Sequence, residues 1–561
     1  MNEKPKKPPA CDACKARRVL CHPQPNGAPC PRCVEKNSVC TTTPVARGRP
    51  RKNPLPPSYK SSSISRRPSP PSSQQNQSLS KTSSNCPELT PNFVQHCFDG
   101  LELTPQYNHP LILSTSIKTD IRAVSFQLHL LPPQSQVLAL CIICCASLNS
   151  FHPAVLGEGP RPESFVDPRF FSSCPDLRGF GVRRAPVYRA LCAVAHKAAW
   201  EVGIILQPSN ENAASCFLLD LLEQYDFSGA SRPWANAYMS HVRALAPIWR
   251  TNEAYIISDA AHWVGHLMGD ALISARSRTP MLVTPNDQLL LCGPEAQSLT
   301  MIIVSLKKFP QIPNLSLLWS LLKSYLSHVI TLSRQLSDTI AGDYARTNPL
   351  SESAIISFIS SLVQMHTALT LILDHVDASI DPLSNNNSPL VLDNVARTCA
   401  YGSIFGFIGL VLPFYRELQY RETCDAEVLG YHTRNRLLLL CAQAHELAVL
   451  GVRELARCLR YLPKVHYMPV HWSTIFTWAE FCAEEAESVS AAGLSPECAR
   501  DIEIIVNELK LLGYSLDAVS SPSVQALIQC LEVHINKVNL DMVLPMEGGW
   551  LAGPFDVELA Y

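Results

Sequence analysis

The sequence predicts a mainly α-helical protein, in which a small cysteine-rich head is joined through a disordered linker to a large all-helical body. Six of the 22 cysteines fall within residues 11–40. Residues 53–92 contain twelve Ser and eight Pro, a linker composition that cannot bury an apolar core. Between residues 93 and 537, apolar residues recur three or four positions apart, whereas the two-residue alternation of strands is scarce.

The charge is divided unevenly between head and body. The whole chain has a formal net charge of -1, but residues 1–67 carry fifteen Lys and Arg against three acids. The body is therefore mildly acidic. A basic head on an acidic body indicates that only the head meets a polyanion. No apolar stretch follows the N-terminal lysines, so we expect a reduced, intracellular protein rather than a secreted disulfide scaffold.

The body is expected to be soluble and to have no membrane partner. Its longest mostly apolar run, residues 400–414, is too short to cross a bilayer, and polar residues interrupt residues 354–373. Residues 400–414 are predicted to form a buried helix. Ser209 and Ser351 are expected to cap helices. The predicted helices span residues 133–148, 209–225, 351–373, 393–421, 433–461, 472–490, 494–513 and 521–537.

The cysteines of the head repeat one spacing, C-x2-C-x6-C, twice. Each unit supplies three sulfurs, whereas zinc takes four in a closed tetrahedral site, so two units satisfy two ions only by sharing ligands. Six thiolates and two zinc ions leave a net charge of about -2, which the surrounding Lys and Arg offset. The ligands expected are Cys11, Cys14, Cys21, Cys30, Cys33 and Cys40.

Two other arrangements of these cysteines are possible. Cys11, Cys14, Cys30 and Cys33 alone fit a zinc ribbon, which leaves the matched positions of the other two cysteines to coincidence. A disulfide knot conflicts with the reduced compartment. His22 could supply a ligand, but six sulfurs suffice, and we expect a surface residue there.

The segment Cys-Asp-Ala-Cys-Lys-Ala-Arg-Arg-Val-Leu-Cys, with Pro-Cys-Pro-Arg-Cys further on, resembles the fungal binuclear zinc cluster (Zn2Cys6) DNA-binding domain. The resemblance implies that Cys11 and Cys30 bridge the two metals. One ion would also take Cys14 and Cys21, and the other Cys33 and Cys40. It further implies two related short helices, one of which is presented to the major groove of DNA, often at CGG triplets.

The first of these helices carries Lys15, Arg17 and Arg18. Arginine bonds guanine through O6 and N7 together, so Arg17 and Arg18 are expected at base edges and Lys15 nearer the phosphates. The alternative is that these charges merely balance the cluster. Where the family commonly has a basic residue just before the third cysteine, this chain has Val19-Leu20.

A second basic segment, residues 46–52, resembles an AT-hook. Gly48 and Pro50 favour an extended backbone that approaches closely, so that Arg47 and Arg49 can lie along a narrow A·T minor groove. Nuclear import or phosphate attraction are the alternatives. The basic residues assigned to DNA from this segment are Arg47, Arg49, Arg51 and Lys52.

The body contains stretches such as Leu130-Leu131-Pro132-Pro133-Gln134-Ser135 and Arg232-Pro233-Trp234-Ala235-Asn236-Ala237-Tyr238. Through these stretches, residues 93–520 resemble the helical middle regulatory region of the same fungal regulators. The combined expectation is a nuclear transcription factor that binds double-stranded DNA. No nucleotide-binding, hydrolase or metalloprotease motif is present, so no catalytic or further cofactor-binding residue is assigned and no enzyme is expected. The rivals are a metabolite receptor or enzyme-like body anchored by the cluster, and a zinc-stabilised module that does not contact DNA.

Two regions are expected to bind proteins. The linker has no heptad repeat, so any homodimer is expected to form through the helical body. Residues 538–561 mix four acids with large apolar residues and have no Lys or Arg. This composition is typical of activation segments that bind a coactivator. A coactivator or a corepressor could bind through the helical body or through this tail. Alternatively, Trp550 and Phe555 dock on the body as a strap.

Overall fold

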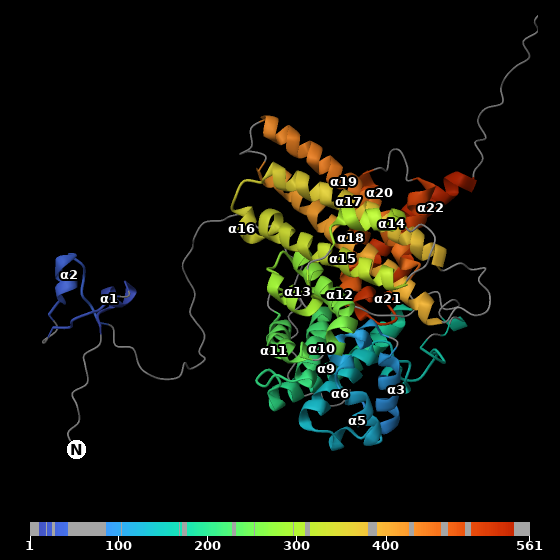
Figure 1. Ribbon diagram of the computed structural model, residues 1–561, viewed down its shortest axis with the longest axis horizontal. Coiled ribbons are helices and arrows are strands. Elements are labelled where there is room, and N and C mark those ends of the chain that lie inside the picture. Colours follow the sequence, from blue (N-terminus) through green and yellow to red (C-terminus); the bar gives the residue numbers. More distant parts are fainter. Residues whose placement is uncertain are drawn as a thin grey trace, which may run out of the picture. The chain divides into compact units, whose positions relative to one another are not determined.

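The computed structural model describes most of the head and the body. The described residues are 10–17, 19–24, 28–42, 86–102, 104–165, 167, 169–170, 177–226, 232–251, 253–294, 297–308, 315–379, 390–425, 431–461, 469–488 and 495–543. They contain helices and no strand, which confirms the mainly α fold (Figure 1). The chain divides into two units, Met1–Gln77 and Ser78–Tyr561.

The head contains two short helices, α1 (Asp12–Ala16) and α2 (Pro31–Glu35). Residues 43–85, which include the AT-hook-like segment and most of the predicted linker, lie outside the described residues. Arg18 also lies outside them.

The first half of the body consists of helices of mixed length. Their bounds are α3 (Pro91–Leu101), η2 (Pro105–Asn108), α4 (Pro110–Leu113), α5 (Ile117–Ala123), η3 (Leu128–Leu130), α6 (Pro133–Ser147), α7 (Pro153–Leu156), α9 (Arg178–Val202), α10 (Asn210–Asp226) and α11 (Pro233–Trp249).

The second half is dominated by long helices. Their bounds are α12 (Glu253–Ser277), α13 (Pro285–Cys292), α14 (Leu299–Lys308), α15 (Leu315–Gln335), η4 (Leu336–Ala341), α16 (Asp343–Arg346), α17 (Glu352–Ser379), α18 (Leu390–Asp425), α19 (Tyr431–Leu459), α20 (Pro469–Ser488), α21 (Pro496–Leu512), η5 (Asp517–Ser520) and α22 (Pro522–Val543).

The predicted caps are present. The Ser209 hydroxyl accepts a hydrogen bond from the Asn212 N–H at 3.1 Å, so α10 begins where the sequence indicated. The Ser351 hydroxyl accepts from the Ala354 N–H at 3.3 Å and starts α17 in the same way. Each bond satisfies one of the backbone donors that a helix leaves free at its N-terminus.

Helix α18 lies at the centre of the second half and packs against α12, α15, α17 and α19 (Figure 1). Its side chains are buried on nearly every side between Cys399 and Leu418, which explains why its apolar residues show no single stripe. The helix therefore forms the core around which its neighbours assemble.

By length and apolar composition alone, residues Glu352–Asp377 of α17 and Arg397–Cys424 of α18 would be long enough to span a membrane. In the structure α18 is mostly buried inside the body. Helix α17 buries one stripe and exposes polar residues such as Ser360, Gln364 and Asp374 on the other face. This pattern is typical of a surface helix of a globular protein.

The body is longer at both ends than the sequence predicted. Thr90 caps α3, and Cys86 and Leu89 already pack against the core, so ordered packing begins within the predicted linker. At the other end α22 continues to Val543, six residues into the predicted tail. Pro545 supplies the next helix-breaking residue. Residues 544–561, with Trp550 and Phe555, lie outside the described residues.

Candidate metal centre

The head is built from two copies of one local structure. Cys11 and Cys30, 19 residues apart, are the N-caps of α1 and α2, and both have an extended backbone. The carbonyl of Cys11 accepts from the Lys15 N–H at 3.0 Å, and that of Cys30 accepts from the Val34 N–H at 3.1 Å. The repeated cysteine spacing therefore produces a repeated helix start, as the sequence suggested.

In each unit the chain folds back, so that the third cysteine lies beside the first. The Cys11 N–H donates to the Cys21 sulfur at 3.5 Å, and the Cys30 N–H donates to the Cys40 sulfur at 3.3 Å. These bonds bring the cysteine after each short helix back to the cap of that helix. All three sulfurs of a unit thereby face the same centre.

The six sulfurs form two overlapping groups of four. One contains Cys11, Cys14, Cys21 and Cys30, and the other contains Cys11, Cys30, Cys33 and Cys40. Within each group the ligand atoms lie within 4.8 Å of one another. Cys11 and Cys30 belong to both groups, so these two sulfurs occupy the shared positions.

The sulfur separations suit a metal rather than a disulfide. The Cys11 sulfur lies 3.9 Å from that of Cys30 and 3.6 Å from that of Cys33, and the Cys14 sulfur lies 3.7 Å from that of Cys30. A tetrahedron with zinc–sulfur bonds of about 2.3 Å has edges of about 3.8 Å, whereas a disulfide bond measures about 2.05 Å. The site therefore fits a tetrahedral thiolate-bound metal.

The geometry also argues against the two other arrangements of these cysteines, the zinc ribbon and the disulfide knot. A four-cysteine ribbon leaves Cys21 and Cys40 unused, yet each completes one of the two groups. All six cysteines are free thiols, which gives a disulfide knot no support. His22 is exposed and belongs to neither sulfur group.

The local backbone favours thiolate at the two shared positions. The backbone hydrogen bond from Cys14 lowers the pKa of the Cys11 thiol to about 6, and the equivalent bond from Cys33 lowers the pKa of Cys30. Burial instead raises the pKa of Cys14 to about 12 and raises that of Cys33. A bound cation would deprotonate the remaining thiols, because coordination stabilises the thiolate.

Among the residues of the head that the structure describes, the cysteine sulfurs form the core, and the buried residues are Cys11, Cys14, Cys30 and Cys33. The larger apolar side chains of this unit lie on its surface, with Leu20 69% and Val39 81% exposed. So small a unit depends on a metal for its folding energy, since burial of apolar surface cannot supply it.

The two described residues assigned to DNA lie on the surface at α1. Lys15, in the last turn of α1, forms an ion pair with Asp12 at 3.5 Å, and its side chain stays 44% exposed. Arg17 caps the C-terminus of α1, and its guanidinium donates to the Ser38 hydroxyl at 3.4 Å. The structure thus places Lys15 and Arg17 on the surface of the head, each with a different partner. The other residues assigned to DNA, Arg18, Arg47, Arg49, Arg51 and Lys52, lie outside the described residues.

No protein-family model, curated protein or solved structure matches this chain. The resemblance of residues 11–40 to binuclear zinc clusters therefore rests on the cysteine spacing and the sulfur geometry.

Sequence reasoning missed a second candidate site, a cavity in the helical body. Arginines from α12, α16 and α18 line this cavity, and they lie up to 140 positions apart along the chain. Such a site leaves no local signal in the sequence, because only tertiary packing brings its residues together.

Proposed function

We propose that this chain is a zinc-dependent, sequence-specific DNA-binding transcription factor that regulates RNA polymerase II genes in the nucleus. Its head would bind two zinc ions through six cysteines, with Cys11 and Cys30 as bridging ligands. The observation that carries the proposal is the pair of overlapping sulfur groups in a basic segment. The helical body would serve regulation rather than catalysis.

The distribution of charge in the head favours α1 over α2 as the DNA-facing helix. The segment from α1 to its C-terminal cap contains Lys15 and Arg17, and the sequence continues with Arg18. At the equivalent positions of the second unit stand Val34, Lys36 and Asn37. Because DNA attracts the more basic helix, α1 is the better candidate for the major groove.

The basic residues have distinct proposed roles. Arg17 and Arg18 would contact guanines of a CGG-like triplet, and Lys15 would contact phosphates. Arg47 and Arg49 would follow the minor groove of flanking A·T pairs, with Arg51 and Lys52 adding phosphate contacts. Leu20 stands exposed where the family usually has a basic side chain, so one basic contact is missing from this surface.

Two steps test the proposal. The full-length protein loaded with zinc first selects the duplexes that it binds from random DNA. The affinity of each variant for the selected site is then measured by titration. Arg17→Ala and Arg18→Ala should each cost about 1–3 kcal/mol at the selected site and relax its sequence preference. Lys36→Ala is the matched control, because Lys36 caps α2 as Arg17 caps α1. It should cost less and leave the preference unchanged.

Three outcomes discriminate between the models. Loss of binding only where A·T pairs flank the site, on replacing Arg47 and Arg49, would support minor-groove contact. Equal losses on every duplex would reduce these residues to phosphate attraction. Absence of salt-sensitive duplex binding by the zinc-loaded protein would instead support an interaction module that does not contact DNA.

A transcription factor also needs protein partners, and the chain offers two places where they would bind. A coactivator or corepressor would bind the helical body or residues 544–561, and a homodimer would form through the body. Fusion of residues 538–561 to a foreign DNA-binding domain, with reporter transcription as the readout, separates an activation segment from a strap.

A further inference from the structure

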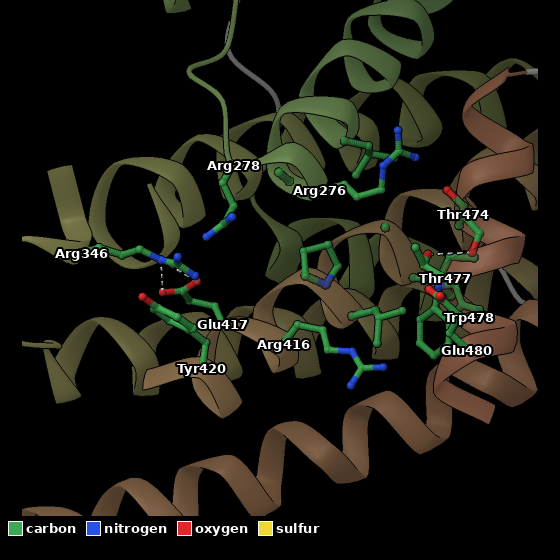
Figure 2. A pocket seen from close by; sticks show the side chains of 16 residues that line it. Arg276, Arg278, Arg346, Arg416, Glu417, Tyr420, Thr474, Thr477, Trp478 and Glu480 are labelled. Atoms are coloured by element: carbon green, nitrogen blue, oxygen red, sulfur yellow. Dashed lines mark hydrogen bonds and ion pairs between the residues drawn. The ribbon is translucent and has the colours of Figure 1, made fainter. Parts of the chain in front are cut away.

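A cavity of about 390 Å³ lies within the helical body, between the C-terminal end of α12 and helices α16, α18 and α20 (Figure 2). Its volume falls within the range of small-molecule sites, roughly 300–1,000 Å³. The charged residues that line it are Arg276, Arg278, Arg346, Arg416, Glu417 and Glu480. The cavity thus collects four arginines against two carboxylates.

Two of the four arginines are paired with neighbouring carboxylates. The Arg346 guanidinium donates to Glu417 at 2.9 Å and 3.1 Å and stacks over the Tyr420 ring at 3.7 Å. Glu417 also accepts from Arg421 at 3.1 Å. Arg416 donates to Glu484 at 2.5 Å. These contacts hold Arg346 and Arg416 in place, so both form structural walls of the cavity.

The other two arginines have no such partner. Among the described residues, no carboxylate pairs with Arg276 or Arg278. The polar contact of the Arg276 guanidinium is the neutral hydroxyl of Ser473. Burial, together with the positive charge of Arg232, lowers the pKa of Arg276 to about 10. A partly buried guanidinium without a counter-ion is unfavourable, and a bound anion would supply the missing charge.

Arg278 lies at another side of the same cavity. It follows the end of α12 in a left-handed conformation, with φ of 57°, which is a common way for a helix to end. The side chain is exposed and lines the cavity, and Figure 2 shows it extending toward the side where Arg346 and Glu417 meet.

Much of the remaining lining is apolar and comprises Leu272, Ile408, Leu412, Pro413 and the Trp478 ring. The polar hydroxyls of Thr474 and Thr477 lie on the α20 side, next to Trp478 (Figure 2). A ligand that fills this space therefore needs an apolar part as well as an anionic head.

We propose that this cavity binds a small amphiphilic anion, an organic carboxylate or phosphate monoester whose head pairs with Arg276 and whose apolar part packs against Leu412, Pro413 and Trp478. Arginine suits both head groups, because its planar fork bonds two oxygens together. This inference does not depend on DNA binding, since all the residues involved belong to the helical body.

The test is isothermal titration calorimetry on the full-length protein without DNA. The probes are octanoate, octyl phosphate and the neutral octan-1-ol, which share one apolar chain and differ in the head. The two anions should bind at least tenfold more tightly than octan-1-ol, and the tighter of the two identifies the head group preferred. Equal affinity for all three probes would overturn the proposal.

Substitutions locate the site. Arg276→Gln should weaken binding of the preferred anion about tenfold or more, and Arg276→Lys should weaken it less because it keeps the charge. Arg278→Gln should weaken binding less than Arg276→Gln, because Arg278 extends toward another side of the cavity. Arg453→Gln is the control, since Arg453 is an exposed arginine of α19 outside the cavity. Because Arg276→Lys keeps the charge, it should fold even if Arg276→Gln does not. Unchanged affinity in either Arg276 variant, with wild-type thermal unfolding, would contradict the assignment.

Discussion

Arg184 shows how a single side chain joins distant parts of the body. It is fully buried in α9, donates to the carbonyl of Tyr514 at 2.8 Å, and donates to the carbonyls of Ser147 and Ser150 at 2.6 Å and 3.0 Å. The guanidinium also stacks over the Tyr514 ring at 4.5 Å. One residue therefore connects α9 with the end of α6 and with the loop after α21.

Replacing Arg184 should destabilise the body. Arg184→Met leaves three buried carbonyls without this donor, and we expect a loss of roughly 2–4 kcal/mol in the free energy of unfolding. Urea denaturation followed by tryptophan fluorescence measures it. The neighbouring Arg183 is only partly buried and donates to the carbonyls of Glu158 and Pro160, so Arg183→Met should cost less than about 1 kcal/mol. Equal costs for both variants would contradict this role of Arg184.

Arg232 has a related role at the junction of two helices. Its guanidinium donates to Asp220 of α10 at 2.7 Å and to Asp270 of α12 at 2.5 Å. All three side chains are largely buried. An arginine between two carboxylates compensates charges that would be costly to bury alone.

At the scale of elements, α1 and α2 are too short to be stable alone. Each has five residues, and isolated helices need roughly 12–15 residues even to be marginal in water. Their structure therefore depends on the sulfur-lined centre between them. The number of metal ions bound per chain should therefore report whether the head is folded.

Cys11 and Cys30 should matter more for metal binding than the other four cysteines, because their sulfurs are shared. We expect the wild-type chain to bind two zinc ions, and Cys11→Ser or Cys30→Ser to remove both, because each of these sulfurs belongs to both groups. Native mass spectrometry and elemental analysis count the ions. Cys424→Ser, at an exposed cysteine outside the head, should retain two. One ion per wild-type chain would refute the shared-ligand arrangement.

At the scale of the whole molecule, buried histidines should make the body acid-sensitive. Burial lowers the pKa of His96 to about 4 and that of His266 to about 3, and holds the pKa of His109 well below 6.5. As the pH falls below 6.5, the unfolded chain takes up protons that the folded body excludes. Stability should therefore fall with the pH from about 6.5 to about 4.

The size of this effect can be measured. Between pH 7 and pH 5, each of these three imidazoles should cost roughly 2 kcal/mol. Urea midpoints read by tryptophan fluorescence report the body alone, since the first tryptophan is Trp200. His266→Gln should flatten the pH dependence, whereas His129→Gln, at an exposed position, should leave it unchanged. A midpoint independent of pH would contradict the prediction.

The separation of head and body leads to a prediction about assembly. The chain divides into two units near residue 77, and residues 41–92 carry no heptad repeat. A zinc-loaded fragment of residues 1–92 should be monomeric in analytical ultracentrifugation and bind one half-site. A dimeric fragment would show that the head or the linker associates by itself.

Much of the helical structure could be predicted from local patterns. All eight predicted helices exist, because their apolar periodicity and their caps, such as Ser209 and Ser351, act within a few residues. Helix α9 was not predicted, and it contains Pro186 together with Gly179 and Gly181, which weaken the local signal. It is stabilised by tertiary contacts instead, including those of Arg184.

The sequence by itself determined the head and its ligands, because a metal site built from C-x2-C-x6-C units depends on spacing, and spacing is visible in one dimension. It also determined that the body is helical. Only the tertiary structure decided which side chains of the body meet. Arg276 and Arg278 share a cavity with Trp478 some 200 residues away. The packing of α12, α18 and α20 brings them together, and packing depends on side-chain contacts over the whole chain that no local pattern encodes.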